Sequence, residues 1–130
     1  MKSTFSYLVV IIFCSQFACN ESTHSTSRDV YVSFEVESSF QNDLVTVILG
    51  DKTLLESRVT TNDIVSLAWA SGLQKLHGDT QSLYVALSEY AVQAGYKIDL
   101  TNDTSTVTIN FDKSTKQIRF QQYKGRLLRD

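Results

Sequence analysis

The segment Val30-Tyr31-Val32-Ser33-Phe34-Glu35-Val36 decides the fold, because its side chains alternate strictly between apolar and outward-facing types. Successive side chains of a β-strand point to opposite faces of a sheet. The four apolar members therefore share one face, and Tyr31, Ser33 and Glu35 share the other. This pattern predicts a strand with one buried side and one solvent-facing side.

Strand patterns of the same kind recur along the rest of the chain. Residues 44–49 form a continuous apolar run typical of a central strand, and Gly50-Asp51-Lys52 closes a hairpin with residues 53–61. Further alternating segments are 83–87, 96–100, 107–111 and 118–120, and the turn residues are at 38–43, 78–79, 95, 102–103 and 112–114. About seven short strands at roughly 8 to 12 residue intervals predict an all-β fold, a small antiparallel β-sandwich with immunoglobulin-like topology.

Residues 62–76 fit two predictions. Apolar residues from Ile64 to Leu76 also fall at helical spacing, and Thr61 or Asn62 is available as a cap. We favour an extended segment with a bend near Gly72, because every neighbouring segment reads as a strand with short connections. A helix here would pack across one sheet.

The N-terminal region predicts export. Lys2 precedes an apolar run at 7–13, which is much shorter than the about 20 residues that a membrane-spanning helix needs. The Ser/Thr-rich residues 20–27 contain no apolar side chain to bury. We therefore expect a cleaved signal peptide at 1–18, a flexible tether at 19–28 and a β-sandwich domain at 29–130.

Cys19 follows Ala18 at the end of the signal region, and the other cysteine, Cys14, lies within the apolar segment. A short apolar stretch that ends in a small residue and then cysteine resembles bacterial lipoprotein signals. The resemblance covers this segment alone. It implies that Cys19 becomes the lipid-bearing N-terminus and that a membrane is a partner. The alternative is an ordinary secretory signal, with Cys19 discarded or incidental and the domain freely secreted.

Charge and composition limit the classes of partner that we expect this protein to bind. The formal net charge is −2, and removal of Lys2 with the signal makes it about −3. With no basic stripe along the domain, nucleic acid is not an expected partner. The C-terminal Lys124-Gly125-Arg126 and the residues after it are locally basic, which fits contact with an anionic surface or a frayed terminal strand.

The sequence offers little for catalysis or metal binding. His24 lies in the tether, and His77 is interpreted as a solvated turn residue beside Gly78. One histidine and no cysteine within the domain exclude zinc, and we expect no cofactor. Aspartates at turns allow calcium, although turn capping is the preferred interpretation; they are Asp43, Asp63, Asp79, Asp99, Asp103 and Asp112.

Aromatic residues suggest ligand binding. Tyr31, Trp69 and Tyr84 are the candidate ligand-binding residues, because exposed aromatic rings stack on sugars, although cross-strand pairing and core packing explain the same residues. We expect a non-catalytic binding or interaction module at the cell envelope, which contacts its partner through a sheet face or edge. A carbohydrate-binding module is the alternative. A hydrolase using Glu35, Glu37, Glu56 or Glu89 ranks third.

Overall fold

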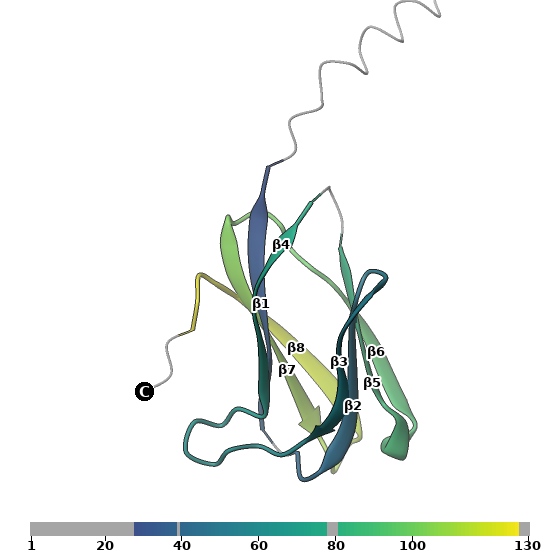
Figure 1. The fold of residues 1–130 in the computed structure, drawn as a ribbon. Coiled ribbons are helices and arrows are strands. Elements are labelled where there is room, and N and C mark those ends of the chain that lie inside the picture. Colours follow the sequence, from purple (N-terminus) through teal and green to yellow (C-terminus); the bar gives the residue numbers. More distant parts are fainter. Residues whose placement is uncertain (1–27, 39, 78–80, 128–130) are drawn as a thin grey trace, which may run out of the picture.

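Eight strands account for most of the residues that the computed structural model describes, which are 28–38, 40–77 and 81–127. They form two four-stranded sheets that pack against each other (Figure 1). The strands are β1 (Val30–Val36), β2 (Asp43–Leu49), β3 (Lys52–Val59), β4 (Trp69–Leu76), β5 (Ser82–Leu87), β6 (Val92–Lys97), β7 (Thr104–Asp112) and β8 (Gln117–Lys124), with a 3-10 turn, η1 (Ser88–Tyr90), between β5 and β6. The predicted all-β sandwich is confirmed.

The strand order is β4-β1-β7-β8 in the first sheet and β3-β2-β5-β6 in the second. β1 pairs with β4 in the first sheet, which corresponds to the pairing of strands B and E in immunoglobulin sandwiches. β2 pairs with β5 in the second sheet, which corresponds to the pairing of strands C and F. β7 lies on the other side of β1, where strand A lies in those domains, but it runs parallel to β1. The remaining strand pairs among the described residues are antiparallel, as predicted.

The parallel pair follows from the connection between β6 and β7. Residues 98–103 cross from the second sheet to the first, and the Asp103 carbonyl accepts a hydrogen bond from Tyr31 N–H at 2.8 Å. β7 therefore begins beside the start of β1, and the two strands run in the same direction. Residue alternation does not encode this choice, because it is identical in parallel and antiparallel strands.

The core lies between the sheets and is built from the alternating apolar positions. Each fully buried aliphatic or aromatic side chain stabilises the fold by about 1.5–3 kcal/mol relative to exposure. The hydrophobic side chains with zero exposure come from both sheets: Val32, Phe34, Val36, Val45, Val47, Leu83, Val85, Val107 and Ile109. The inward phase predicted for residues 30–36 is therefore confirmed.

The sixth strand differs from its predicted position. We expected a turn at Gly95 and a strand over 96–100, but β6 begins at Val92, and Gly95 lies within it opposite Tyr84. The chain reverses instead at Ala91, whose φ of 52° is left-handed. Alanine rarely adopts this conformation, so its residue type gave no turn signal.

Residues 62–76 contain no helix. β4 is extended, and Gly72 within it has a φ of 70°, next to a register shift against β1. The predicted bend near Gly72 is thus confirmed, because a positive φ there is accessible to glycine without strain. Residues 60–68 form a loop that is closed by the pairing of Asn62 with Leu67.

The loops gather at two ends of the sandwich (Figure 1). We call the end that holds Arg28 and the loop at residues 98–103 the tether end, and the end that holds residues 37–42, 60–68, 88–91 and 113–116 the distal end. The predicted signal peptide, Cys19 and the tether up to residue 27 lie outside the described residues, as does the predicted turn at 78–79. None of the helical segments in the described ranges has the length and apolar character needed to cross a bilayer.

Candidate functional site

Three large hydrophobic side chains are exposed on the outward face of the first sheet. Tyr31, Leu73 and Tyr123 are 39%, 43% and 40% exposed. The strand register places Leu73, Ser33, Thr106 and Tyr123 in one row across all four strands. At the usual strand spacing this row spans about 14 Å. Tyr31 lies two residues before Ser33 on β1, on the same face.

The middle of this face is polar and closely packed. Ser33 is 7% exposed and Thr106 is fully buried, although both occupy outward positions on the central strands. The Thr106 hydroxyl donates a hydrogen bond to the Gly125 carbonyl at 2.9 Å. Leu73 and Tyr123, on the two edge strands, therefore lie on either side of two buried polar side chains. We call Tyr31, Ser33, Leu73, Thr106 and Tyr123 the tyrosine face.

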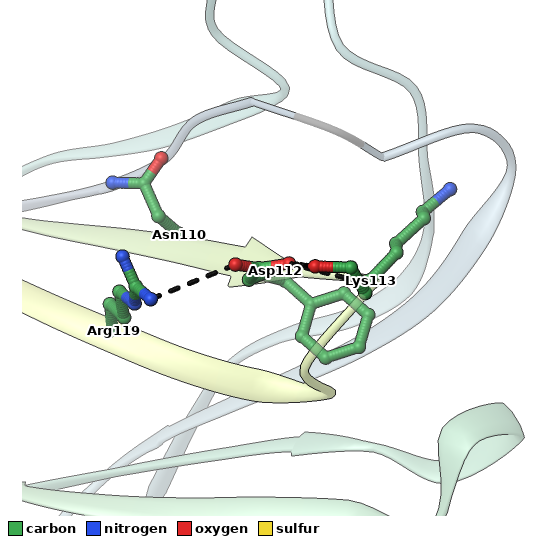
Figure 2. A pocket seen from close by; sticks show the side chains of 6 residues that line it. Asn110, Asp112, Lys113 and Arg119 are labelled. Carbon is green, nitrogen blue, oxygen red and sulfur yellow. Dashed lines mark hydrogen bonds and ion pairs between the residues drawn. The ribbon is translucent and has the colours of Figure 1, made fainter.

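The same sheet becomes more polar toward the distal end. Figure 2 shows Asn110 beside Arg119, which forms an ion pair with Asp112 at 3.7 Å. Asn110 donates its side-chain N–H to Glu37 Oε2 at 3.0 Å. Asn110, Arg119 and Gln121 line a surface hollow of about 560 Å³. The tyrosine face is thus continuous with groups that donate and accept hydrogen bonds.

The structure separates the three predicted ligand-binding residues. Tyr84 is 36% exposed but lies on the outward face of the second sheet, on the other side of the sandwich from Tyr31. Its hydroxyl donates a hydrogen bond to Gln93 Oε1 on β6. Trp69 packs against the hydrophobic core. The structure therefore does not bring Trp69 and Tyr84 together with Tyr31 in one site.

Tyr123, and not Tyr84 or Trp69, is the second aromatic residue on the sheet face that carries Tyr31. It faces the same side as Tyr31 because β8 alternates, with Ile118 and Phe120 packed toward the core. Its hydroxyl donates to Gln121 Oε1 on the same strand at 2.6 Å. Extending the predicted alternation of 118–120 by three residues places Tyr123 on the outward face, so the signal was present in the sequence.

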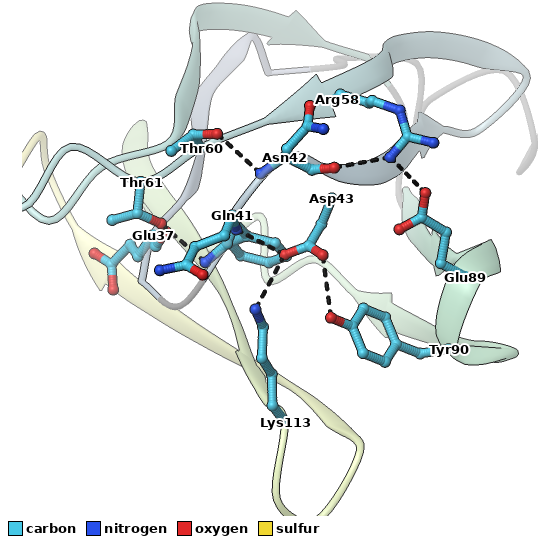
Figure 3. A network of polar contacts seen from close by, with 11 residues as sticks. Glu37, Gln41, Asn42, Asp43, Arg58, Thr60, Thr61, Glu89, Tyr90 and Lys113 are labelled. Carbon is cyan, nitrogen blue, oxygen red and sulfur yellow. Dashed lines mark hydrogen bonds and ion pairs between the residues drawn. The ribbon is translucent and has the colours of Figure 1, made fainter.

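A hydrogen-bond network at the distal end is centred on Asp43 (Figure 3). Asp43 is only 4% exposed. Its Oδ2 accepts the Gln41 N–H at 2.8 Å and faces Lys113 Nζ at 3.4 Å, while Oδ1 accepts the Tyr90 hydroxyl at 3.1 Å. Burial alone raises the pKa of this carboxyl, but these hydrogen bonds and the ammonium charge outweigh burial and hold the pKa below its ordinary value.

The rest of this network joins loops to strands. The Thr61 hydroxyl accepts the Phe40 N–H at 3.1 Å and donates to the Glu37 carbonyl at 2.8 Å. Arg58 donates to the Asn42 carbonyl at 2.8 Å and pairs with Glu89 (Figure 3). These contacts hold the distal loops in place. Together with the contacts of Asp43, these hydrogen bonds and ion pairs connect the two sheets at the distal end, and we call this network the distal joint.

The predicted carboxylate candidates are distributed over several elements. Glu35 and Glu37 belong to β1 and the residue after it, Glu56 belongs to β3 in the other sheet, and Glu89 belongs to η1, where it pairs with Arg58. The arrangement assigns Glu89 to the distal joint. It also places Glu56 in a different sheet from Glu35 and Glu37.

The turn aspartates are divided between the two ends. Asp99 Oδ1 accepts the Thr101 N–H, and Asp112 Oδ1 accepts the Ser114 N–H, each at 2.9 Å. The bond from the Thr101 N–H lowers the pKa of Asp99, and the pKa of Asp112 is lowered most by the Ser114 hydroxyl, which donates to Asp112 Oδ1 at 2.6 Å. Asp103 pairs with Arg28 at 3.0 Å. The remaining candidates are Asp43 in the network above, Asp63 beside a distal hollow, and Asp79, which lies outside the described residues.

Within residues 28–38, 40–77 and 81–127, no three His, Cys, Asp or Glu side chains gather in a way that suits a metal ion. His77 Nδ1 lies 3.4 Å from Asp29 Oδ1 at the tether end. Protein-family models, curated proteins and solved structures were compared with the chain, and none matches.

Proposed function

We propose that this protein is an exported module that is anchored to a membrane by lipid on Cys19 and binds a protein or other envelope component through the tyrosine face. It has no catalytic role in this proposal. The residues before 28 supply the export signal and tether, as argued from their sequence. The sandwich supplies a rigid platform for the binding surface.

One observation carries the binding part of the proposal. The described residues expose five large hydrophobic side chains, and three of them, Tyr31, Leu73 and Tyr123, share one sheet face. Single exposed apolar residues are ordinary, but several grouped beside polar ones are typical of interaction sites. Tyrosine is also enriched at interfaces, because its ring is apolar and its hydroxyl remains able to bond.

The hydrogen bonds of the buried Asp43 carboxyl support the non-catalytic part of the proposal. The buried carboxyl of Asp43 has its two oxygens engaged with Gln41, Lys113 and Tyr90. Its low pKa keeps it ionised near neutral pH, whereas a general acid needs a pKa near the working pH. This buried carboxylate is thus committed to the fold.

A photo-crosslinking experiment tests the binding face. A benzophenone amino acid replaces Leu73 or Tyr123 in the exported protein, and, as the matched control, Tyr84, which is similarly exposed on the opposite sheet. We expect the two positions on the tyrosine face to capture the same envelope component and Tyr84 to capture none of it. Equal capture from Tyr84, or different components from Leu73 and Tyr123, contradicts the proposal.

A second candidate is a freely secreted carbohydrate-binding module. It is favoured by Tyr31 and Tyr123 lying on one sheet face, which also carries the polar side chains of the surface hollow, namely Asn110, Arg119 and Gln121. Aromatic rings contact the apolar faces of sugars, while hydroxyls and amides bond their polar groups. A glycan array distinguishes the two candidates, because a carbohydrate-binding module gives defined hits that Tyr31→Ala and Tyr123→Ala both remove.

A further inference from the structure

Arg28 fixes the point at which the chain leaves the sandwich. Its Nη2 donates to the Thr101 carbonyl at 2.6 Å and to the Leu100 carbonyl at 3.2 Å, and its Nε lies 3.0 Å from Asp103 Oδ1. The first described residue is therefore held against the loop at residues 98–103. Only nine residue steps separate Arg28 from Cys19, so the chain between them spans at most about 30 Å.

A surface hollow of about 370 Å³ opens beside this point. It is lined by Arg28, Thr101, Asn102, Asp103, Thr104, Lys124 and Gly125. The lining offers one guanidinium, one ammonium, two hydroxyls and an amide, all of which can donate hydrogen bonds. Its single carboxylate, Asp103, pairs with Arg28, so the lining keeps one net positive charge, which Lys124 supplies. Such a donor set suits a phosphate group.

Further positive charge lies at the tether end. Lys97 ends β6 and Arg126 follows β8, and the two strands meet where the Tyr96 and Phe120 rings stack at 5.2 Å. Among the described residues, the tether end carries six cationic side chains against four carboxylates, and the distal end carries four cationic side chains against five carboxylates. The tether-end set is Arg28, Lys52, Lys75, Lys97, Lys124 and Arg126 with Asp29, Asp51, Asp99 and Asp103, and the distal set is Arg58, Lys113, Lys116 and Arg119 with Glu37, Asp43, Asp63, Glu89 and Asp112.

We propose that the hollow beside Arg28 and Lys124 binds headgroup phosphates of anionic phospholipids in the membrane that carries the lipid anchor. The short connection to Cys19 brings this end to the bilayer, and its charge is complementary to an anionic surface. The contact sets the sandwich end-on, with the distal loops away from the membrane. The tyrosine face, which crosses the strands of the first sheet, then faces sideways from the sandwich and not into the bilayer, and it remains open to a partner.

This inference rests on the proposed anchoring, and it is tested in the full exported chain carrying Cys19→Ser, which has no lipid. The chain is co-sedimented with phosphatidylcholine vesicles that contain or lack phosphatidylglycerol. We expect partition onto the anionic vesicles to be at least about fivefold stronger and to fall as salt screens the charges. Equal partition onto both kinds of vesicle overturns the inference.

Charge reversal locates the contact. We expect Lys124→Glu with Arg126→Glu to reduce partition to the level of neutral vesicles, and Lys116→Glu, an exposed turn residue at the distal end, to leave it unchanged. An equal loss with Lys116→Glu overturns the assigned surface. Displacement of the protein by millimolar inorganic phosphate also overturns it, because the hollow is then a site for free phosphate. Unchanged circular dichroism checks the fold of each variant.

The two proposals fail in different ways. The vesicle assay uses a protein that has no acyl groups on Cys19. If the native exported chain carries no acyl groups, the anchoring proposal is contradicted, but the vesicle result can still be interpreted. Weak vesicle binding contradicts the proposed headgroup contact, but it does not bear on the anchoring proposal, which the mass of the native protein tests.

Discussion

Tyr96 on β6 donates its hydroxyl to Gln122 Oε1 on β8 at 3.1 Å, and this hydrogen bond joins the edge strands of the two sheets. The same Gln122 oxygen accepts the Asp99 N–H at 2.9 Å. The Gln122 side-chain nitrogen donates to the Asp99 carbonyl and to the Ser105 hydroxyl. One amide therefore closes the side of the sandwich and fixes the loop that leads into β7.

Replacing Gln122 by alanine leaves the fully buried Ser105 hydroxyl and the Asp99 backbone without these partners. We expect a loss of about 2–3 kcal/mol in the free energy of unfolding. Urea denaturation measures it, with Gln117→Ala at the exposed start of β8 as the control, which should change stability by less than about 0.5 kcal/mol. Equal effects of the two variants contradict the structural role of Gln122.

The lowered pKa of Asp43 predicts how the free energy of unfolding depends on pH. Its pKa is lower in the folded state than in the unfolded state, so the unfolded chain takes up the proton more readily. The stabilisation is therefore present above the ordinary aspartate pKa of about 3.9 and is lost as the pH falls through the folded value. We expect Asp43→Asn to reduce the difference in unfolding free energy between pH 7 and pH 3.

The control for this experiment is Asp51→Asn in the exposed turn between β2 and β3. It should preserve the full acid dependence of the natural protein. Part of that dependence remains in Asp43→Asn as well, because the pKa values of Asp99 and Asp112 are also lowered by turn hydrogen bonds. An identical pH profile for Asp43→Asn and the natural protein is the contradicting result.

Tyr84 and Tyr123 have similar exposure but are predicted to differ in role. Tyr84 faces Gly95 across the strand pair and bonds to Gln93, so Tyr84→Ala should lower stability by about 1 kcal/mol and leave partner binding intact. Tyr123→Ala should weaken partner binding at least tenfold. Thermal unfolding and a binding titration with the crosslinked component separate the two effects, and the reverse assignment contradicts the account.

Trp69 is predicted to stabilise the fold. It faces Val36 across the β1–β4 pair and packs against the core. Trp69→Ala should therefore lower the free energy of unfolding by about 2 kcal/mol, less than a fully buried tryptophan because it is half-buried. A Trp69→Ala protein with unchanged stability but no ligand binding restores Trp69 as a ligand contact.

Local alternation predicted most of the fold. The strand at Val30–Val36 and the hairpin around Gly50, whose φ is 61°, formed as expected, because apolar alternation and glycine turns are local properties. The solvent-facing side predicted for this strand was wrong for Ser33 and Glu35, which are buried because β1 is a central strand between β4 and β7. The reversal at Ala91 was missed because its left-handed conformation is imposed by the pairing of β5 with β6. The parallel pairing of β1 with β7 is long-range, and the residues of neither strand specify it.

The candidate site was predicted only in part. Tyr31 was placed on an outward face by alternation, which the structure confirms. Sequence spacing gives the phase of a residue within its strand but not the sheet to which the strand belongs. Tyr84 and Tyr123 thus have equivalent patterns, and only strand order shows that Tyr123 shares the face of Tyr31.

The central claim is that Cys19 carries the anchor of a membrane-held binding module. The intact mass of the protein recovered from its native membrane or medium, compared with that of a Cys19→Ser form, tests it most directly. The account predicts a mature chain that begins at Cys19 with the added mass of acyl chains, which the substitution abolishes. A lipid-free mass recovered from the medium contradicts it.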